Sequence, residues 1–143
     1  MAVLYGAAAA NVFNTNPQTK ASPGEHGGTI RSLTDTVTYA TQTTSDTIVI
    51  GGGYLPVGAR VLEVIMTTSV STSTATLALG ISGSTSKYKS AGAITTTNVP
   101  QIYGVAAALN VPLTAPEQLF LTIGTASLPA SGTLVVTVKY VVD

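Results

Sequence analysis

The chain has 143 residues, of which 45% are hydrophobic and 8% are charged, and six basic side chains balance six acidic ones. This length fits one domain, and the absence of cysteine excludes thiol catalysis, disulfide bonds, thiolate zinc sites and iron–sulfur ligation. The formal net charge of zero argues against a nucleic-acid partner, because such proteins use excess Lys and Arg to neutralise phosphates.

The rest of the composition favours β-structure. Threonine and serine, at 24 and 12 residues, make up a quarter of the chain, and Val and Ile outnumber Glu, Lys and Arg. No stretch approaches the roughly 18–20 consecutive apolar residues of a membrane-spanning helix. No Lys or Arg precedes the first apolar run, as one would in a secretory signal. We therefore predict a soluble, all-β protein with no membrane partner.

Residues 1–28 differ from the rest of the chain. An apolar patch is followed by Asn, Pro and Gly at a density that blocks helices and sheet ladders. We interpret 1–28 as an extended N-terminal arm and loop, and 29–143 as the folded domain. The apolar side chains of the arm either dock on a neighbouring subunit or fold back onto their own domain, and 7–10 alternatively form one helical turn. These side chains are Val3, Leu4, Tyr5, Val12 and Phe13.

The sequence that follows alternates with a period of two, which is typical of half-buried strands. Leu33, Val37 and Tyr39 predict the inward face of the first strand. A second strand, 46–50, is predicted to stop at the three glycines 51–53.

The third and fourth strands are predicted at 60–69 and 73–82, joined as a hairpin by the turn 69–72. Alternation assigns Val61, Glu63, Ile65 and Thr67 to one face of the third strand, and Leu62, Val64 and Met66 to the other. In the fourth strand it points Ala75, Leu77, Leu79 and Ile81 inward.

The second half of the chain is less regular. We interpret 87–91 as a crossing segment or one helical turn, with Lys87 and Lys89 in a solvated turn. Short runs at 93–97 and 101–110 precede a proline-containing connection at 110–116, and strands are predicted at 118–124 and 133–142. Seven or eight strands at this spacing predict a single-domain β-sandwich or jelly roll.

The sequence offers little for catalysis or for cofactor or metal binding. The one histidine, His26, lies in a Pro/Gly-rich loop, and a triad would need that loop ordered against a serine and an acid. The carboxylates are scattered singly, and the glycines 51–53 lack the Gly-Lys-Ser/Thr of a phosphate-binding loop. We predict no catalytic residue, no cofactor-binding residue, no metal ligand and no enzymatic activity.

Tyrosine is the better guide to function. Tyr54, Tyr88 and Tyr103, like Tyr5 in the arm, lie outside the strands that the pattern defines best. Tyrosine is favoured at protein interfaces because its ring buries area while its hydroxyl finds a hydrogen-bond partner. These residues are therefore predicted to anchor a partner.

Six segments carry a family resemblance: Gly27–Arg31, Asp46–Ile48, Leu55–Leu62, Leu77–Gly80, Leu121–Gly124 and Val138–Asp143. Taken in this order, they resemble the small structural proteins of tailed bacteriophages, many of which are capsid decoration or cement proteins. The resemblance implies a β-sandwich that binds the major capsid protein on the outer surface of the virion and stabilises the phage head without catalysis. It also implies a homotrimer, or alternatively a homodimer, made in the host bacterial cytoplasm. A phage fibre or receptor-binding module is the alternative function.

Overall fold

The computed structural model describes residues 28–142, which form strands, turns and loops and contain no helix. The prediction of an all-β fold is confirmed. The eight strands are β1 (Ile30–Thr38), β2 (Thr47–Leu55), β3 (Ala59–Thr68), β4 (Thr76–Ile81), β5 (Ser84–Gly92), β6 (Gln101–Tyr103), β7 (Glu117–Gly124) and β8 (Thr133–Val142).

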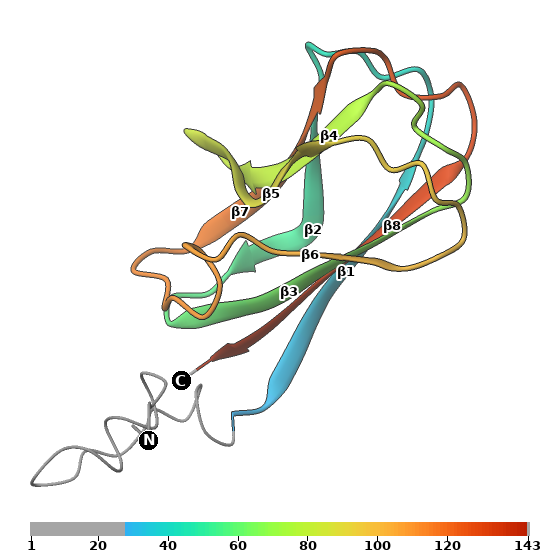
Figure 1. The fold of residues 1–143 in the computed structure, drawn as a ribbon. Coiled ribbons are helices and arrows are strands. Elements are labelled where there is room, and N and C mark those ends of the chain that lie inside the picture. The colour runs from blue at the N-terminus through green and yellow to red at the C-terminus, as the bar shows by residue number, and fades with distance from the viewer. Residues whose placement is uncertain (1–27, 143) are drawn as a thin grey trace, which may run out of the picture.

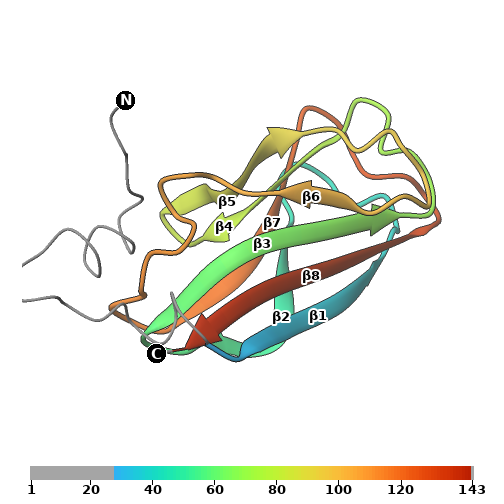
Figure 2. The same ribbon diagram turned by 60° about the horizontal axis from the view of Figure 1, so that its bottom comes forward.

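The strands form two four-stranded antiparallel sheets that lie face to face (Figures 1 and 2). Sheet A has the order β1-β8-β3-β6 and sheet B the order β2-β7-β4-β5. The first strand pairs with the last, the second with the seventh, the third with the sixth and the fourth with the fifth. This nested pairing is the jelly roll, so the prediction of a β-sandwich or jelly roll with seven or eight strands is confirmed.

The core lies between the two sheets and is built from alternating strand residues. In β8, Leu134, Val136 and Val138 are fully buried, whereas Val135 on the opposite face is exposed. In β7, Leu119, Leu121 and Ile123 are buried in the same way. Burial of one such side chain contributes roughly 1.5–3 kcal/mol before the cost of ordering the chain, so this double layer is the main source of stability.

The predicted hairpin between the third and fourth strands is wrong. β3 belongs to sheet A and β4 to sheet B, so the segment between them crosses from one sheet to the other. Thr72 fixes this crossing, because its hydroxyl donates to the Ala75 carbonyl and accepts a hydrogen bond from the Ile94 amide, both at 2.9 Å. A hydroxyl-rich turn looks the same in sequence whether it folds back or crosses over.

The predicted faces of β3 are wrong at one end. The register of β3 on β8 shifts between Val61 and Glu63, which is the signature of a β-bulge. Val61 is therefore buried on the same side as Val64 and Met66, while Glu63 is only half-buried. Alternation of a single sequence cannot show where an extra residue resets the period.

The second strand does not stop at the glycines, because β2 runs on to Leu55. Gly51 has a φ of +79°, and a Cβ added to it would lie 2.5 Å from Cδ2 of Leu33 on β1. Only glycine combines this backbone conformation with so close an approach to the neighbouring sheet. Residues 51–53 are thus a bend inside a strand.

The segment predicted as a crossing or helical turn is strand β5. Its pairing with β4 contains register shifts, and Tyr88 and Lys89 are both buried although they are consecutive. A bulge therefore hides the alternation that would have identified the strand. The run 101–110 is shorter than predicted, because only Gln101–Tyr103 is strand, and 93–97 is loop with one bridge from Thr97 to Thr68.

Candidate interaction surfaces

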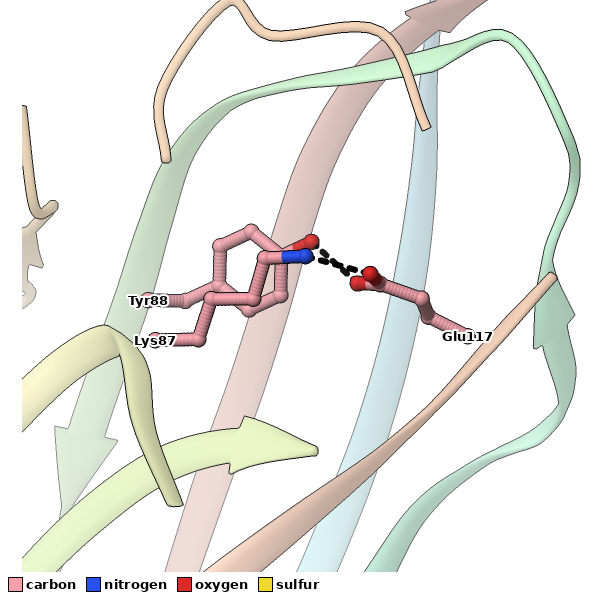
Figure 3. A network of polar contacts seen from close by, with 3 residues as sticks. All are labelled: Lys87, Tyr88 and Glu117. Atoms are coloured by element: carbon pink, nitrogen blue, oxygen red, sulfur yellow. Dashed lines mark hydrogen bonds and ion pairs between the residues drawn. The ribbon is translucent and has the colours of Figure 1, made fainter. Parts of the chain in front are cut away.

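A polar network joins β5 to the start of β7 (Figure 3). Lys87 Nζ and the Tyr88 hydroxyl both donate to Glu117, the lysine to Oε1 and the tyrosine to Oε2 at 2.5 Å. Burial, reinforced by the hydrogen bond and by the negative charge of Glu117, raises the pKa of the Tyr88 hydroxyl far above its usual value. Tyr88 therefore stays a proton donor, and both oxygens of Glu117 are engaged within the domain.

Lys89 is buried one position further along β5. Its Nζ donates to the carbonyl oxygens of Leu77 at 2.7 Å and Ser90 at 3.1 Å. The same Nζ lies 4.5 Å from the centroid of the Tyr103 ring on β6, so Lys89 links the edge strands of the two sheets. Burial lowers the pKa of Lys89 to about 8. The expectation that Lys87 and Lys89 occupy a solvated turn is wrong, because both lie in strand β5, where Lys89 is buried and Lys87 is half-buried.

Asp35 lies at the opposite side of the sandwich, where the edge strands β1 and β2 of the two sheets face each other. It lies on β1 in register with buried Val136, and its Oδ2 accepts the Gly51 amide of β2 at 2.8 Å. Its Oδ1 accepts the amide of Thr36 at 2.8 Å. Asp35 thus connects sheet A to sheet B through a backbone donor, just where β2 bends.

The outer face of sheet A carries a row of β-branched residues. Thr34, Thr137, Ile65 and Ile102 lie side by side across its four strands. Ile102 is 66% exposed and Thr34 is exposed as well. Glu63 and Lys139, which lie on this face, neutralise each other in an ion pair of 2.7 Å.

The outer face of sheet B is hollowed. Two adjoining hollows of about 330 and 280 Å³ share Ile81, Ser82 and Phe120, and together we call them the Phe120 groove. Tyr54 lines the second hollow. Ser82 and Gly83 of the β4–β5 turn form one wall of the groove. The turn packs closely on Gly80, where an added Cβ would lie only 2.1 Å from the Ser84 carbonyl oxygen, so glycine alone admits that contact.

The predicted interface residues are distributed unevenly. Tyr54 is 62% exposed, in β2 at the Phe120 groove, and Tyr103 is half-buried, in β6 over Lys89. Both remain predicted anchors, although both lie in strands rather than outside them as expected. Tyr88 is fully buried in its own domain, so its ring is not on the surface where the prediction placed it. Outside the described residues lie Val3, Leu4, Tyr5, Val12, Phe13 and His26.

Sequence reasoning missed Phe120, the centre of the groove. A signal for it was present, because Phe120 alternates with buried Leu119 and Leu121 and shares its face with Gln118 and Thr122. A large aromatic residue on the polar face of a strand indicates an exposed apolar surface.

Among residues 28–142, no group of three or more His, Cys, Asp or Glu side chains is placed to hold a metal ion. No helix in that part of the chain is long and apolar enough to cross a membrane.

The same fold occurs in three phage capsid structures. A chain of the capsid asymmetric unit of cyanophage Pam1 is 24% identical, with a TM-score of 0.71, and the match covers 91% of this chain and 97% of that one. A chain of the capsid of Ralstonia phage GP4 is 18% identical, with a TM-score of 0.65 and coverages of 81% and 86%. A chain of the acid-stable capsid of Helicobacter pylori bacteriophage KHP30 is 13% identical, with a TM-score of 0.56 and coverages of 79% and 87%.

These identities establish a shared jelly roll and nothing finer. No family model matches the sequence, and no curated protein matches it.

Proposed function

We propose that the chain is a non-enzymatic structural protein of a bacteriophage head, which binds the major capsid protein on the outer surface of the shell and stabilises it. The observation that carries this proposal is the match to the Pam1 capsid chain, which spans 91% of this chain and 97% of that one at a TM-score of 0.71. Two further matches to capsid structures of phages with different hosts support it.

The surface chemistry is consistent with this role. Interfaces between proteins are depleted of unpaired charge and enriched in aromatic residues, and bulky apolar side chains fill their buried cores. Ile102, Tyr54 and Val49 project from the two outer faces among threonines, and the charged residues Glu63 and Lys139 are paired with each other. Such faces lose little hydration free energy when another subunit covers them.

We further propose that the chain acts as a homotrimer, with a homodimer as the alternative. A shell presents its subunits around symmetry axes, and an oligomer on such an axis touches several subunits at once. Simultaneous contacts raise avidity by about 10²–10⁴ over one contact. A weak individual interface thereby suffices for durable attachment.

The proposal is tested with heads assembled from the major capsid protein of the phage that encodes the chain. Added protein should sediment with the heads, saturate in fixed proportion to the capsid protein, and raise the temperature at which heads break open. Serum albumin serves as the control for non-specific sedimentation. Failure to bind heads, together with binding to host cells, would instead favour the fibre or receptor-binding module. Light scattering of the free protein measures its oligomeric state separately.

A further inference from the structure

The Phe120 groove combines apolar side chains with the neutral polar side chains of Thr47, Ser82, Thr85, Thr122 and Gln118, and the described residues leave it uncovered. Phe120 and Ile81 form its floor, and Tyr54 stands at one end with 62% of its surface exposed. The charged residue at its edge is Glu117, whose two oxygens are already bound by Lys87 and Tyr88. An occupant of this groove should therefore be uncharged, because an ion there would find no free counter-charge and would lose its hydration, and it should offer apolar side chains to Phe120 and Ile81.

The chain itself contains a segment of this chemistry. Residues 1–19 carry no charged side chain, since Lys20 is the first, and residues 3–13 hold two apolar clusters at 3–5 and 12–13. This segment lies outside the described residues, so its character is known from the sequence alone. The charge-poor groove and the charge-free segment match each other.

The place where the segment joins the domain also fits. Ile30, near the start of the described chain, pairs with Val141, and Val142 next to it pairs with Ala59 at the start of β3. The start of β1, the end of β8 and the start of β3 thus lie at one end of the sandwich (Figure 2). β2 ends at Leu55, four residues before β3 begins, so Tyr54 and the hollow that it lines lie at this end too. The fifteen residues from 13 to 28 reach about 50 Å when extended, which exceeds the roughly 30 Å length of a nine-residue strand.

We infer that the Phe120 groove binds the apolar residues 3–13 of this chain. Val12 and Phe13, with Leu4 and Tyr5, supply the side chains that fill the two hollows. The inference does not depend on the capsid role, because it concerns the chain alone. If both hold, the groove is the surface through which one copy of the protein secures its own terminal segment or that of a neighbouring copy.

Cysteine cross-linking tests the inference on the full chain, since the protein has no native cysteine. Asn14→Cys is combined with Ser82→Cys in the groove, or with Ser32→Cys as the control, an exposed serine on the outer face of sheet A that also lies near the point where the segment joins the domain. A short thiol-to-thiol cross-linker should join the groove pair about tenfold more than the control pair, the ratio that about 1.4 kcal/mol of preference gives. Equal yields at the two positions overturn the inference.

Two further variants of the groove pair show whether apolar contact holds the segment. Phe120→Ser should reduce the cross-link to the control level, whereas Ile102→Ser, a comparable apolar loss on sheet A, should leave it unchanged. If Phe120→Ser unfolds, the double change Val12→Ser and Phe13→Ser removes the contact from the segment side. An undiminished cross-link in that double variant overturns the inference. Mixing chains that each carry one cysteine then identifies which copy supplies the segment, because a docked neighbour yields cross-linked dimers.

Discussion

The sandwich has two open sides, one between the edge strands β1 and β2 and the other between the edge strands β5 and β6. Each side places one charged side chain between the sheets, but the two charges have opposite signs and different partners. On the β1/β2 side, Asp35 points between the sheets and accepts the Gly51 amide. On the β5/β6 side, Lys89 points between the sheets, donates to backbone carbonyls and lies under the Tyr103 ring. An inward charge on an edge strand opposes pairing with a strand of another molecule. Both sides therefore protect the edges of the sheets.

The two sides differ in what the charge costs. Asp35 is half-buried and bound to fixed backbone donors, and the closeness of the sheets there depends on Gly51. Lys89 is 3% exposed, and burial of its ammonium lowers its pKa to about 8. We conclude that the stability of the β1/β2 side depends on steric fit at Gly51, whereas the stability of the β5/β6 side is lowered by the buried charge of Lys89.

The largest expected effect breaks the β1/β2 side. Gly51→Val should lower the free energy of unfolding by about 2–4 kcal/mol, because a Cβ there meets Leu33 and a φ of +79° strains a β-branched residue. Urea unfolding followed by circular dichroism measures the loss. Gly52→Ala is the control, since nothing lies within 4 Å of an added Cβ there. Equal losses in the two variants would contradict the steric account.

The second prediction concerns the β5/β6 side and the pH dependence of the free energy of unfolding that Lys89 causes. The unfolded lysine, with its ordinary pKa of 10.5, binds more protons than the folded one between about pH 8 and 10.5, so stability rises with pH in that window. From pH 7 to 9.5 the native chain should gain about 2 kcal/mol relative to Lys89→Met. Measurements stop at 9.5, because the raised pKa values of Tyr88 and Tyr103 act in the opposite direction above about pH 10. If the free energy of unfolding changed with pH in the same way for the native chain and Lys89→Met, the charge of Lys89 would not lower the stability of this side.

The third prediction concerns the neighbouring contact on the β5 side. Glu117→Gln should cost about 1–2 kcal/mol, because it removes the charge that binds Lys87 and leaves one acceptor for two donors. Glu63→Gln, in the more exposed pair with Lys139, should cost less than about 0.5 kcal/mol. Thermal unfolding of the two variants compares them directly. A larger loss at Glu63 would place the stabilising charge on the outer face of sheet A instead.

The smallest expected effect on the fold comes from removing residues 1–13, which precede the first strand. Deletion of residues 1–13 should leave the strand signature in circular dichroism unchanged, since residues 28–142 contain all eight described strands and a buried core between them. The same deletion should weaken attachment to the shell or to other copies. A truncated chain that fails to fold would show that the segment belongs to the core of its own domain.

Sequence predicted the fold where alternation is uninterrupted. The predicted strand 133–142 has the bounds of β8, and 118–124 differs from β7 by one residue. Prediction failed at bulges, because one extra residue resets the period, as at Leu62 in β3 and around Lys89 in β5. It failed again at the β3–β4 crossing, where pairing depends on contacts distant in sequence.

The role of the predicted anchor residues stays a prediction, and the structure shows only their exposure. Tyr54 is exposed and Tyr88 is buried, since residue type alone does not reveal which face of a bulged strand a side chain occupies. Phe120 is a half-buried residue that alternation places on the outer face but that composition does not single out. The groove itself depends on Gly80 and the β4–β5 turn, whose packing no local pattern encodes.

The most direct test of the proposed capsid role is a cryo-electron microscopy reconstruction of the particle of any phage whose genome carries the gene for this chain. The account predicts density that fits this jelly roll on the outer surface of the shell, at sites that repeat with the capsid symmetry and touch the major capsid protein. Density for the domain on tail fibres, with none on the shell, would contradict it.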